Sequence, residues 1–196
     1  LTNVQDSSGA SPLHEAVRYG RYEIAQLLLQ ASADPNARDN LGKTPVLLIM
    51  PEEQRAQLYS LLLNKGADIS VKDMYGDTVL NTATMTTVPV DILKTLVSAG
   101  ADINARNKEG VTPLAIAIEN NVIDHIRFYA DNGADINTKN TEGETPLTIA
   151  LKSSENLLEI IVNKNNVNSQ DSDGNTPLNV AIIQNATLDK IQYILS

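Results

Sequence analysis

The sequence contains no cysteine and no tryptophan, and it has a single phenylalanine. Without cysteine there can be no disulfide, no thiolate nucleophile and no zinc site built from cysteine ligands. Aromatic residues make up 4% of a chain that is 42% hydrophobic, so its core must consist mainly of aliphatic and small side chains. Side chains of this kind suit helices that pack closely together.

Positive charge is also scarce, because 15 Lys and Arg residues face 24 Asp and Glu residues and leave a net charge of −9. Proteins that bind duplex nucleic acid displace counterions from phosphates with many basic side chains, so no nucleic-acid partner is expected. The same deficit disfavours anionic membrane surfaces. No apolar run approaches the ~18 residues of a membrane span, and no secretion signal opens the chain, so membrane insertion is not expected either.

What the sequence has in abundance is internal repetition. A block with Asp or Asn first, Gly fourth and Ser or Thr sixth occurs six times, starting at Asp6, Asp39, Asp73, Asn107, Asn140 and Asp171. The glycines of successive blocks lie 33, 34, 34, 33 and 31 residues apart. A regular period of this length indicates a solenoid of stacked structural units.

Each block predicts a turn followed by a helix. The Asp or Asn and the Gly favour a turn, the Ser or Thr caps the helix, and the Pro that follows in five blocks suits the first helical position. A second helix follows, with apolar residues at helical spacing such as Ile24, Leu27 and Leu28. It ends at a left-handed stop, as in the Gly-Ala-Asp run at Gly100. Neither helix can bury its apolar face alone, so neighbouring units must stack.

Some units depart from this pattern. Pro51 and Pro89 should each impose a helix boundary nearby. The third block has Val79 in place of Pro but keeps its threonine cap. In the fifth unit Asn165 and Asn166 replace the Gly-Ala-Asp stop, and we expect Asn to supply the left-handed conformation there.

These residues resemble the ankyrin repeat, in which D-x-x-G-x-T-P-L-H-x-A is followed by a second helix and G-A-D-V-N. The resemblance covers essentially the whole chain and implies an all-α helical repeat solenoid, an ankyrin-repeat stack with short β-hairpin-like fingers. It also implies that partners bind the finger tips and the concave face of the first helices. We expect a single domain over residues 1–196, with units at approximately 4–37, 38–71, 72–105, 106–138, 139–169 and 170–196.

Few residues suggest site chemistry. The resemblance implies that His14 is a buried imidazole bonded to Ser11, whereas we expect His125 to be a partly exposed surface residue. The two histidines are about three repeats apart, and the chain has neither an H-E-x-x-H nor a G-x-S-x-G motif. The run beginning at Asp171 resembles a calcium loop, but its twelfth position is Ile182 rather than Glu. We therefore predict no metal, no cofactor, no small-molecule substrate and no catalytic residue.

The fingers are better candidates for a binding site. The residue just before the block is basic in four successive units, at Arg38, Lys72, Arg106 and Lys139, and we call these residues the basic column. Either basic residues are simply common at this position in the family, or they contribute to binding. Leu41, Met74 and Tyr75 fall at turn tips, where folding gives no reason for large apolar side chains, and rigid aromatics anchor interfaces. The alternative is that they pack against the neighbouring finger. The candidate partner-binding residues are Arg38, Leu41, Lys72, Met74, Tyr75, Arg106, Glu109, Lys139 and Glu142.

The sequence therefore predicts a monomeric, non-enzymatic module that binds a protein or peptide. The alternative is a regulatory or targeting segment of a larger protein, such as an enzyme, a channel or a secreted bacterial effector. It arises because the chain begins with Leu1 and because Asn3 lies partway through a finger, so that either an earlier repeat or a cap is expected upstream. Arrays of this kind occur in several compartments; the cytoplasm is favoured, with bacterial export as the alternative.

Overall fold

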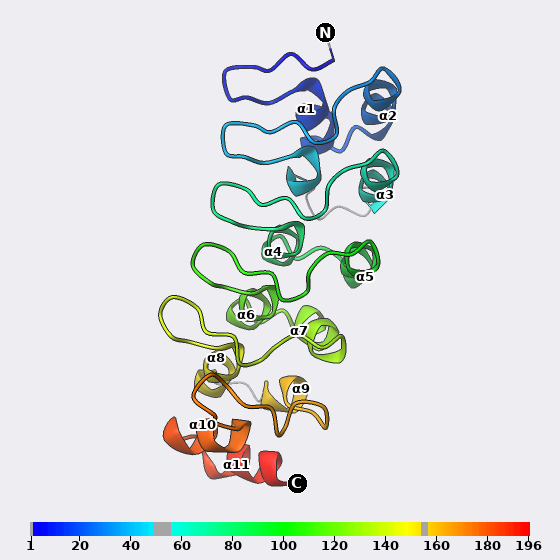
Figure 1. Ribbon diagram of the computed structural model, residues 1–196. Coiled ribbons are helices and arrows are strands. Elements are labelled where there is room, and N and C mark those ends of the chain that lie inside the picture. The colour runs from blue at the N-terminus through cyan, green and yellow to red at the C-terminus, as the bar shows by residue number, and fades with distance from the viewer. Residues whose placement is uncertain (1, 49–55, 154–156) are drawn as a thin grey trace. The chain divides into compact units, whose positions relative to one another are not determined.

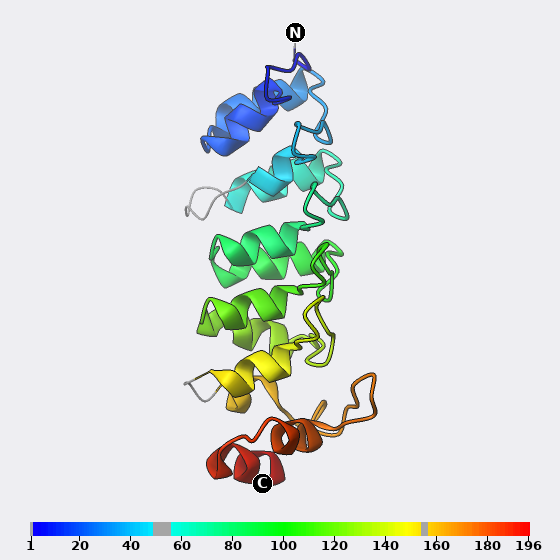
Figure 2. The same cartoon turned by 90° about the vertical axis from the view of Figure 1, so that its left-hand side faces the viewer.

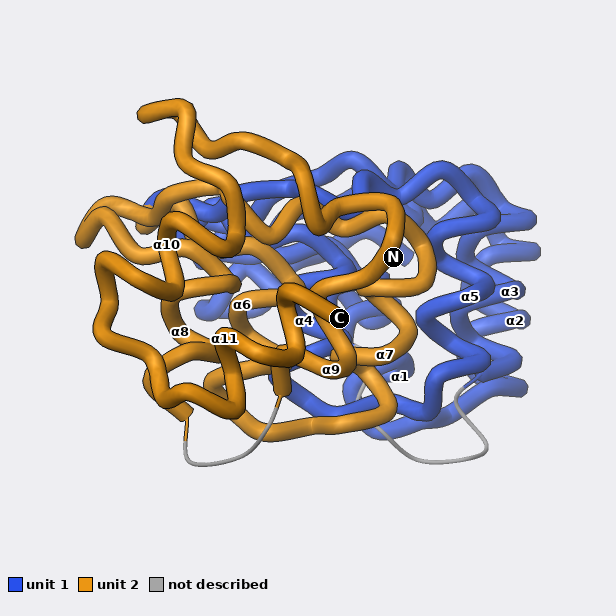
Figure 3. The backbone as a smooth tube through the Cα atoms, turned by 90° about the horizontal axis from the view of Figure 1, so that it is seen from below, with its two compact units in different colours: residues 1–108 blue, residues 109–196 orange. Residues whose placement is uncertain are grey.

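The computed structural model describes residues 2–48, 56–153 and 157–196. Across these residues the regular elements are helices, and no strand is present. They belong to two compact units, residues 1–108 and 109–196, which Figure 3 shows in different colours. The predicted all-helical fold is thus confirmed, while the expectation of one domain over residues 1–196 stays a prediction.

Unit 1 consists of three helix pairs, in each of which a first helix follows a finger and a second helix lies beside it (Figure 1). The first helices are α1 (Pro12–Arg18), the 3-10 helix η1 (Pro45–Leu48) and α4 (Val79–Met85). The second helices are α2 (Tyr22–Gln30), α3 (Ala56–Asn64) and α5 (Val90–Ser98). Helix η1 packs between α1 and α4, and α3 packs between α2 and α5, so the unit has two rows of helices.

Unit 2 repeats this arrangement. Its first helices are α6 (Pro113–Glu119), α8 (Pro146–Lys152) and α10 (Pro177–Ile183), and its second helices are α7 (Ile123–Asp131), α9 (Leu158–Ile161) and α11 (Leu188–Leu195). Helix α8 packs between α6 and α10, and α9 packs between α7 and α11. The helices of both units have at most nine residues, fewer than the ~12–15 that an isolated helix needs, so their stability depends on stacking.

The first helices begin where the capping residues predict. The Thr112 hydroxyl accepts a hydrogen bond from the Ala115 backbone N–H at 3.3 Å at the start of α6. At the start of α1, His14 is fully buried with Nδ1 2.8 Å from the Ser11 hydroxyl oxygen, as predicted. Its Nε2 lies 3.0 Å from the backbone carbonyl oxygen of Lys43. The imidazole therefore closes the first cap and also ties the first repeat to the second.

The core is aliphatic, as the composition predicts. In unit 1 the completely buried side chains include Leu58, Leu62, Leu80 and Leu93, and each leucine removed from water contributes about 2 kcal/mol. Tyr59 is also buried, and this burial raises the pKa of its phenol. The small residues between the leucines let the two rows of short helices pack closely.

Two expectations about exposure are wrong. His125, expected at the surface, is 2% exposed, because α7 buries an unusually wide face that also includes Ile126, Phe128 and Tyr129. In α2, the apolar residues at helical spacing were expected to form a buried face, but this face is not covered. Ile24 is 51% exposed and Leu27 is 64% exposed, whereas Ala25 and Leu29 are buried. Helical periodicity identifies an apolar face but cannot say which neighbour covers it.

The fifth unit also ends its second helix differently from the prediction. Helix α9 stops at Ile161, and neither Asn165 nor Asn166 has a positive φ, so the expected left-handed stop is wrong. Instead the Asn166 side chain donates to the Ile161 carbonyl oxygen at 2.7 Å and closes the helix end. Pro89 directly precedes α5, which confirms one predicted boundary; Pro51 lies outside the described residues.

Candidate interaction surface

Five fingers are tight turns closed by the first residue of the repeated block, namely Asp6, Asp39, Asp73, Asn140 and Asp171. In the second finger, the Gly42 N–H donates to the Asp39 carbonyl oxygen at 2.9 Å, and Gly42 has a φ of +72° that favours glycine. The Asp39 carboxylate accepts the N–H groups of Leu41 and Lys43 at 2.9 and 2.8 Å. The aspartate charge is therefore directed into the turn, while the side chain at the tip remains free to face outward.

Neighbouring finger tips are joined by single backbone hydrogen bonds, which we call the tip ladder. In unit 1 its rungs run from the N–H of Asn40 to Ser8 O (3.0 Å), of Met74 to Leu41 O (2.8 Å) and of Lys108 to Tyr75 O (2.9 Å). In unit 2 the N–H of Thr141 donates to the carbonyl oxygen of Glu109 at 2.8 Å. These bonds fix the spacing between adjacent tips.

The last finger of unit 2 lacks the next rung: within residues 109–153 and 157–196, no hydrogen bond joins Ser172 N to Glu142 O. The space beside Gly143 is open to 4 Å, and Figure 2 shows the last finger, in orange, projecting away from the helices. An ion pair of 2.5 Å between Lys139 Nζ and an Asp173 carboxylate oxygen bridges the two fingers instead. Its hydrogen bond to Asp173 raises the pKa of Lys139.

The basic column of the fingers has a structural role. In unit 1 a long polar side chain donates to the carbonyl oxygen of the equivalent residue in the next finger: Gln5 to Arg38 at 2.7 Å, Arg38 to Lys72 at 3.0 Å and Lys72 to Arg106 at 2.8 Å. The acceptors are neutral, so these bonds space the fingers without cancelling the positive charges. The sequence left open whether the basic column has a structural or a binding role. For Arg38 and Lys72, these hydrogen bonds are enough to explain why a long basic side chain is present.

The three apolar tip residues, Leu41, Met74 and Tyr75, form what we call the tip patch. Their side chains are 44%, 46% and 55% exposed. Leu41 and Met74 lie in adjacent fingers, joined by a rung of the tip ladder. Packing between fingers therefore leaves about half of each residue in water, and the rung from Met74 to Leu41 keeps these exposed apolar residues in neighbouring finger tips.

The candidate residues are divided between the two units. Arg38, Leu41, Lys72, Met74, Tyr75 and Arg106 belong to the fingers of unit 1, and Glu109, Lys139 and Glu142 to those of unit 2. All of them are exposed except Lys139, which is half-buried beside Asp173. The unit 1 set combines apolar and basic side chains, whereas Glu109 and Glu142 of the unit 2 set contribute to an acidic surface.

The acidic surface of unit 2 surrounds a hollow of about 270 Å³ beside the fourth and fifth fingers, lined by Glu109, Val111, Glu119, Asn140, Thr141, Glu142 and Glu144. Glu119, the last residue of α6, has a raised pKa. The largest cause is partial burial, followed by repulsion from the carboxylates of Glu144, Glu142 and Glu109. Like charges held this close destabilise the fold slightly and favour a proton or a cationic partner.

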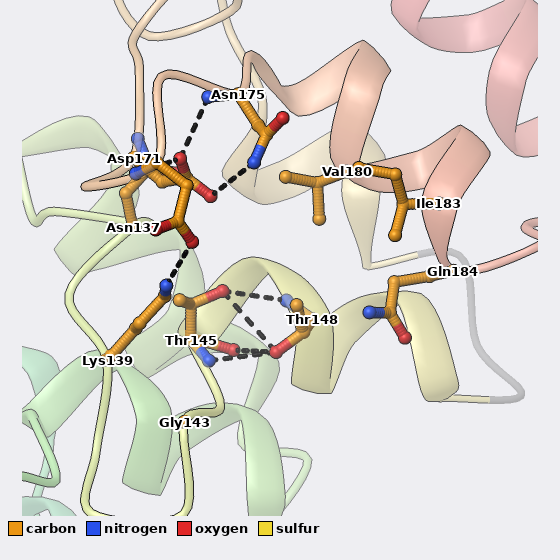
Figure 4. A pocket seen from close by; sticks show the side chains of 11 residues that line it. Asn137, Lys139, Gly143, Thr145, Thr148, Asp171, Asn175, Val180, Ile183 and Gln184 are labelled. Atoms are coloured by element: carbon orange, nitrogen blue, oxygen red, sulfur yellow. Dashed lines mark hydrogen bonds and ion pairs between the residues drawn. The ribbon is translucent and has the colours of Figure 1, made fainter.

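A second hollow of unit 2, of about 190 Å³, lies between the last two fingers (Figure 4). Its polar groups bond to one another: Lys139 pairs with Asp173, Thr145 bonds Thr148, and backbone N–H donation from Asn175 is the main cause of the lowered pKa of Asp171. The hollow is also smaller than the roughly 300 Å³ of a typical ligand pocket.

Other site chemistry finds no support in the part of the chain that the structure describes. It contains no cluster of three His, Asp or Glu side chains placed to hold a metal ion. None of its helices has both the length and the apolar character that a membrane crossing requires.

One surface was not anticipated from the sequence. The outer side of α1 and α2 carries an apolar hollow of about 540 Å³, lined by Pro12, Glu15, Ala16, Tyr19, Arg21, Ile24 and Leu28. Tyr19, which is 64% exposed at the end of α1, is the residue that could have indicated this surface from the sequence. Folding gives no reason for an exposed aromatic side chain directly after a short helix. The apolar residues of α2 could not have indicated it, because the same helical spacing is found on a helix face that packs into the core.

Comparisons with known proteins agree with this geometry. The family model for ankyrin repeats in three copies matches residues 47–140 and 114–196, and the model for the single ankyrin repeat matches residues 8–40. Neurogenic locus notch homolog protein 1 of Homo sapiens is 50% identical over 46 residues, 24% of this chain and 2% of that protein. The transient receptor potential cation channel subfamily A member 1 homolog of Caenorhabditis elegans is 46% identical over 44 residues, 22% of this chain and 4% of that protein. The matched segments thus span only a few per cent of these relatives. With family models matching most of its length, the chain belongs to the ankyrin repeat family.

Proposed function

We propose that this chain is a non-enzymatic interaction module that binds a protein or peptide through its finger tips and concave helical face, with the tip patch as the anchor. Ankyrin repeats are protein-interaction domains and generally not enzymes. One observation carries the assignment of the anchor: Leu41, Met74 and Tyr75 are held together in water by backbone hydrogen bonds. The other candidate residues flank this anchor or extend the surface along the fingers.

The tip patch has the physical properties of an interface anchor. Covering the exposed half of a Leu, Met or Tyr side chain contributes about 1 kcal/mol each, so three neighbouring side chains supply a useful part of a binding free energy. The turns that carry them are closed by Asp39 and Asp73, which leaves little backbone freedom to lose on binding.

The test compares two double variants of the intact chain. Leu41→Ser with Tyr75→Ser removes the anchor, and Leu188→Ser with Leu195→Ser removes two apolar side chains of α11 that are more exposed than those of the anchor. We expect the first variant to lose at least tenfold in captured partner protein, with a melting temperature within about 2 °C of the parent. The control variant should capture as the parent does. Undiminished capture by the first variant, or loss of its fold, would contradict the proposal.

A second candidate is that the array regulates or targets a larger protein. Its support is that the curated relatives are much longer than their matched segments, which amount to 2% and 4% of their lengths. The array would then act on an enzyme, channel or effector part in the same polypeptide. Reading the complete open reading frame decides this, because a frame with little beyond these residues leaves the array nothing to regulate in cis.

A further inference from the structure

We infer that the tip patch binds an acidic polypeptide segment in which a large apolar side chain is flanked by carboxylates. This inference rests on the proposed function and adds the chemistry of the partner.

Basic side chains belong to the fingers that carry the patch and to the next finger along the tip ladder. Arg38, Lys72, Arg106 and Lys108 are all exposed. Arg38 and Lys72 donate to neutral carbonyl groups, and in the described part of unit 1 neither lies within ion-pair distance of a carboxylate. Lys108 lies in the finger next to Tyr75, and its backbone N–H donates to the Tyr75 carbonyl oxygen at 2.9 Å in the tip ladder. The apolar patch is therefore bordered by positive charge.

The carboxylates of the same fingers are turned away from the tips. Asp73 is 6% exposed, accepts the N–H groups of Tyr75 and Asp77 at 2.9 and 3.0 Å, and lies 3.9 Å from Lys43 Nζ. Asp77 accepts a hydrogen bond from the Asn107 side chain at 3.0 Å. These two acids serve their turns, so the second and third fingers present positive charge at their tips, and in the next finger the exposed Lys108 is followed by the exposed Glu109.

A short acidic peptide fits this surface better than a nucleic acid does. Its apolar side chain would cover Leu41, Met74 and Tyr75, and its carboxylates would meet the surrounding cations, which speeds association and sets orientation. A nucleic acid would find one aromatic ring for stacking and a chain of net charge −9 that repels an extended polyanion.

The experiment selects peptides without assuming a sequence. A display library of random 12-residue peptides is panned on the intact chain, and enriched peptides are synthesised and measured by fluorescence anisotropy. We expect peptides with a large apolar residue flanked by Asp or Glu, and at least tenfold weaker binding after these acids are changed to Asn or Gln. Raising the salt concentration from about 50 to 500 mM should weaken binding several-fold.

Protein variants distinguish this inference from the function on which it rests. Leu41→Ser with Tyr75→Ser should abolish binding, and Lys108→Glu should weaken it about tenfold. Lys65→Glu makes the same charge change after the end of α3 and should have little effect. Enriched peptides that are neutral or basic, yet depend on Leu41 and Tyr75, overturn the acidic partner and leave the proposed function standing. Peptides indifferent to Leu41 and Tyr75, or no enriched peptides, overturn both.

A single-stranded oligothymidylate of 12 nucleotides tests the alternative that the tip patch binds a nucleic acid. We expect it to bind at least tenfold more weakly than the best selected peptide. Equal or tighter binding that depends on Tyr75 would overturn the inference in favour of a nucleic-acid partner.

Discussion

Among single residues, the capping hydroxyls of the repeats are unequally satisfied. The Ser11 hydroxyl lies 2.8 Å from the His14 ring, but Leu47 occupies the corresponding position in the second repeat. Thr44 is completely buried there, and its hydroxyl has no hydrogen-bond partner among the described residues. A buried hydroxyl without a partner costs about 1–3 kcal/mol, so the second repeat is locally destabilised. The short 3-10 helix η1 lies at the same place.

We therefore expect opposite effects from two similar substitutions. Thr44→Val removes an unsatisfied hydroxyl at nearly constant volume and should raise the free energy of unfolding by about 1 kcal/mol. Ser11→Ala removes a bonded cap and should lower it by about 1–2 kcal/mol. Urea denaturation of both variants measures the difference. A decrease for Thr44→Val would mean that its hydroxyl does have a partner.

Glu119 gives the residue-level prediction for pH. Because its folded-state pKa is raised by burial and by its acidic neighbours, the proton stabilises the fold. This contribution is present below the ordinary glutamate pKa and is lost as the pH rises through the raised value. Glu119→Gln should therefore stabilise the chain at pH 7 by a few tenths of a kcal/mol, given solvent screening, and leave stability at pH 3.5 unchanged. An equal effect at both pH values would contradict the electrostatic explanation.

Among the elements, the fingers owe their spacing to close backbone contact. A Cβ atom at Gly76 would lie 2.8 Å from the Lys108 backbone nitrogen, whereas one at Gly143 would meet nothing within 4 Å. Both glycines have φ near +80°, so alanine is equally strained at either position.

This makes a matched pair of variants. Gly143→Ala should lower the free energy of unfolding by about 1 kcal/mol through backbone strain alone. Gly76→Ala should cost at least about 1 kcal/mol more, because it also breaks the rung from Lys108 to Tyr75. Chemical denaturation gives both values, and hydrogen exchange at the Lys108 amide should accelerate only in Gly76→Ala. Equal losses in the two variants would show that the tip ladder contributes little.

The elements also show what could be predicted from the sequence. Turns, caps and Pro at the first helical position are local signals, so the starts of α1, α6, α8 and α10 follow directly from them. The early end of α9, the burial of His125 and the exposure of Ile24 depend on what packs against each helix, and no local pattern contains that information. The exposure of Leu41 and Tyr75 could be expected, because turn geometry alone places a tip residue in water. The hydrogen bonds from Arg38 and Lys72 could not, because they depend on the distance between fingers.

For the whole molecule, short helices stabilise one another within each unit, and the fingers carry the variable chemistry. Residues 1–108 have a net charge of −2 and residues 109–196, with 12 acidic and five basic side chains, of −7. The same repeat therefore presents an apolar and basic surface in unit 1 and an acidic surface in unit 2. We propose that binding specificity lies in a few finger residues, while the repeated residues maintain the fold.

The central claim is that the partner contacts the tip patch and leaves the second helices free. It is tested most directly by backbone amide NMR of the intact chain, titrated with the tightest peptide from the selection. We expect the shift changes to be concentrated at Leu41, Met74, Tyr75 and Lys108, with the amides of α2, α3 and α5 unchanged. Changes centred on those helices, with the finger tips unaffected, would contradict it.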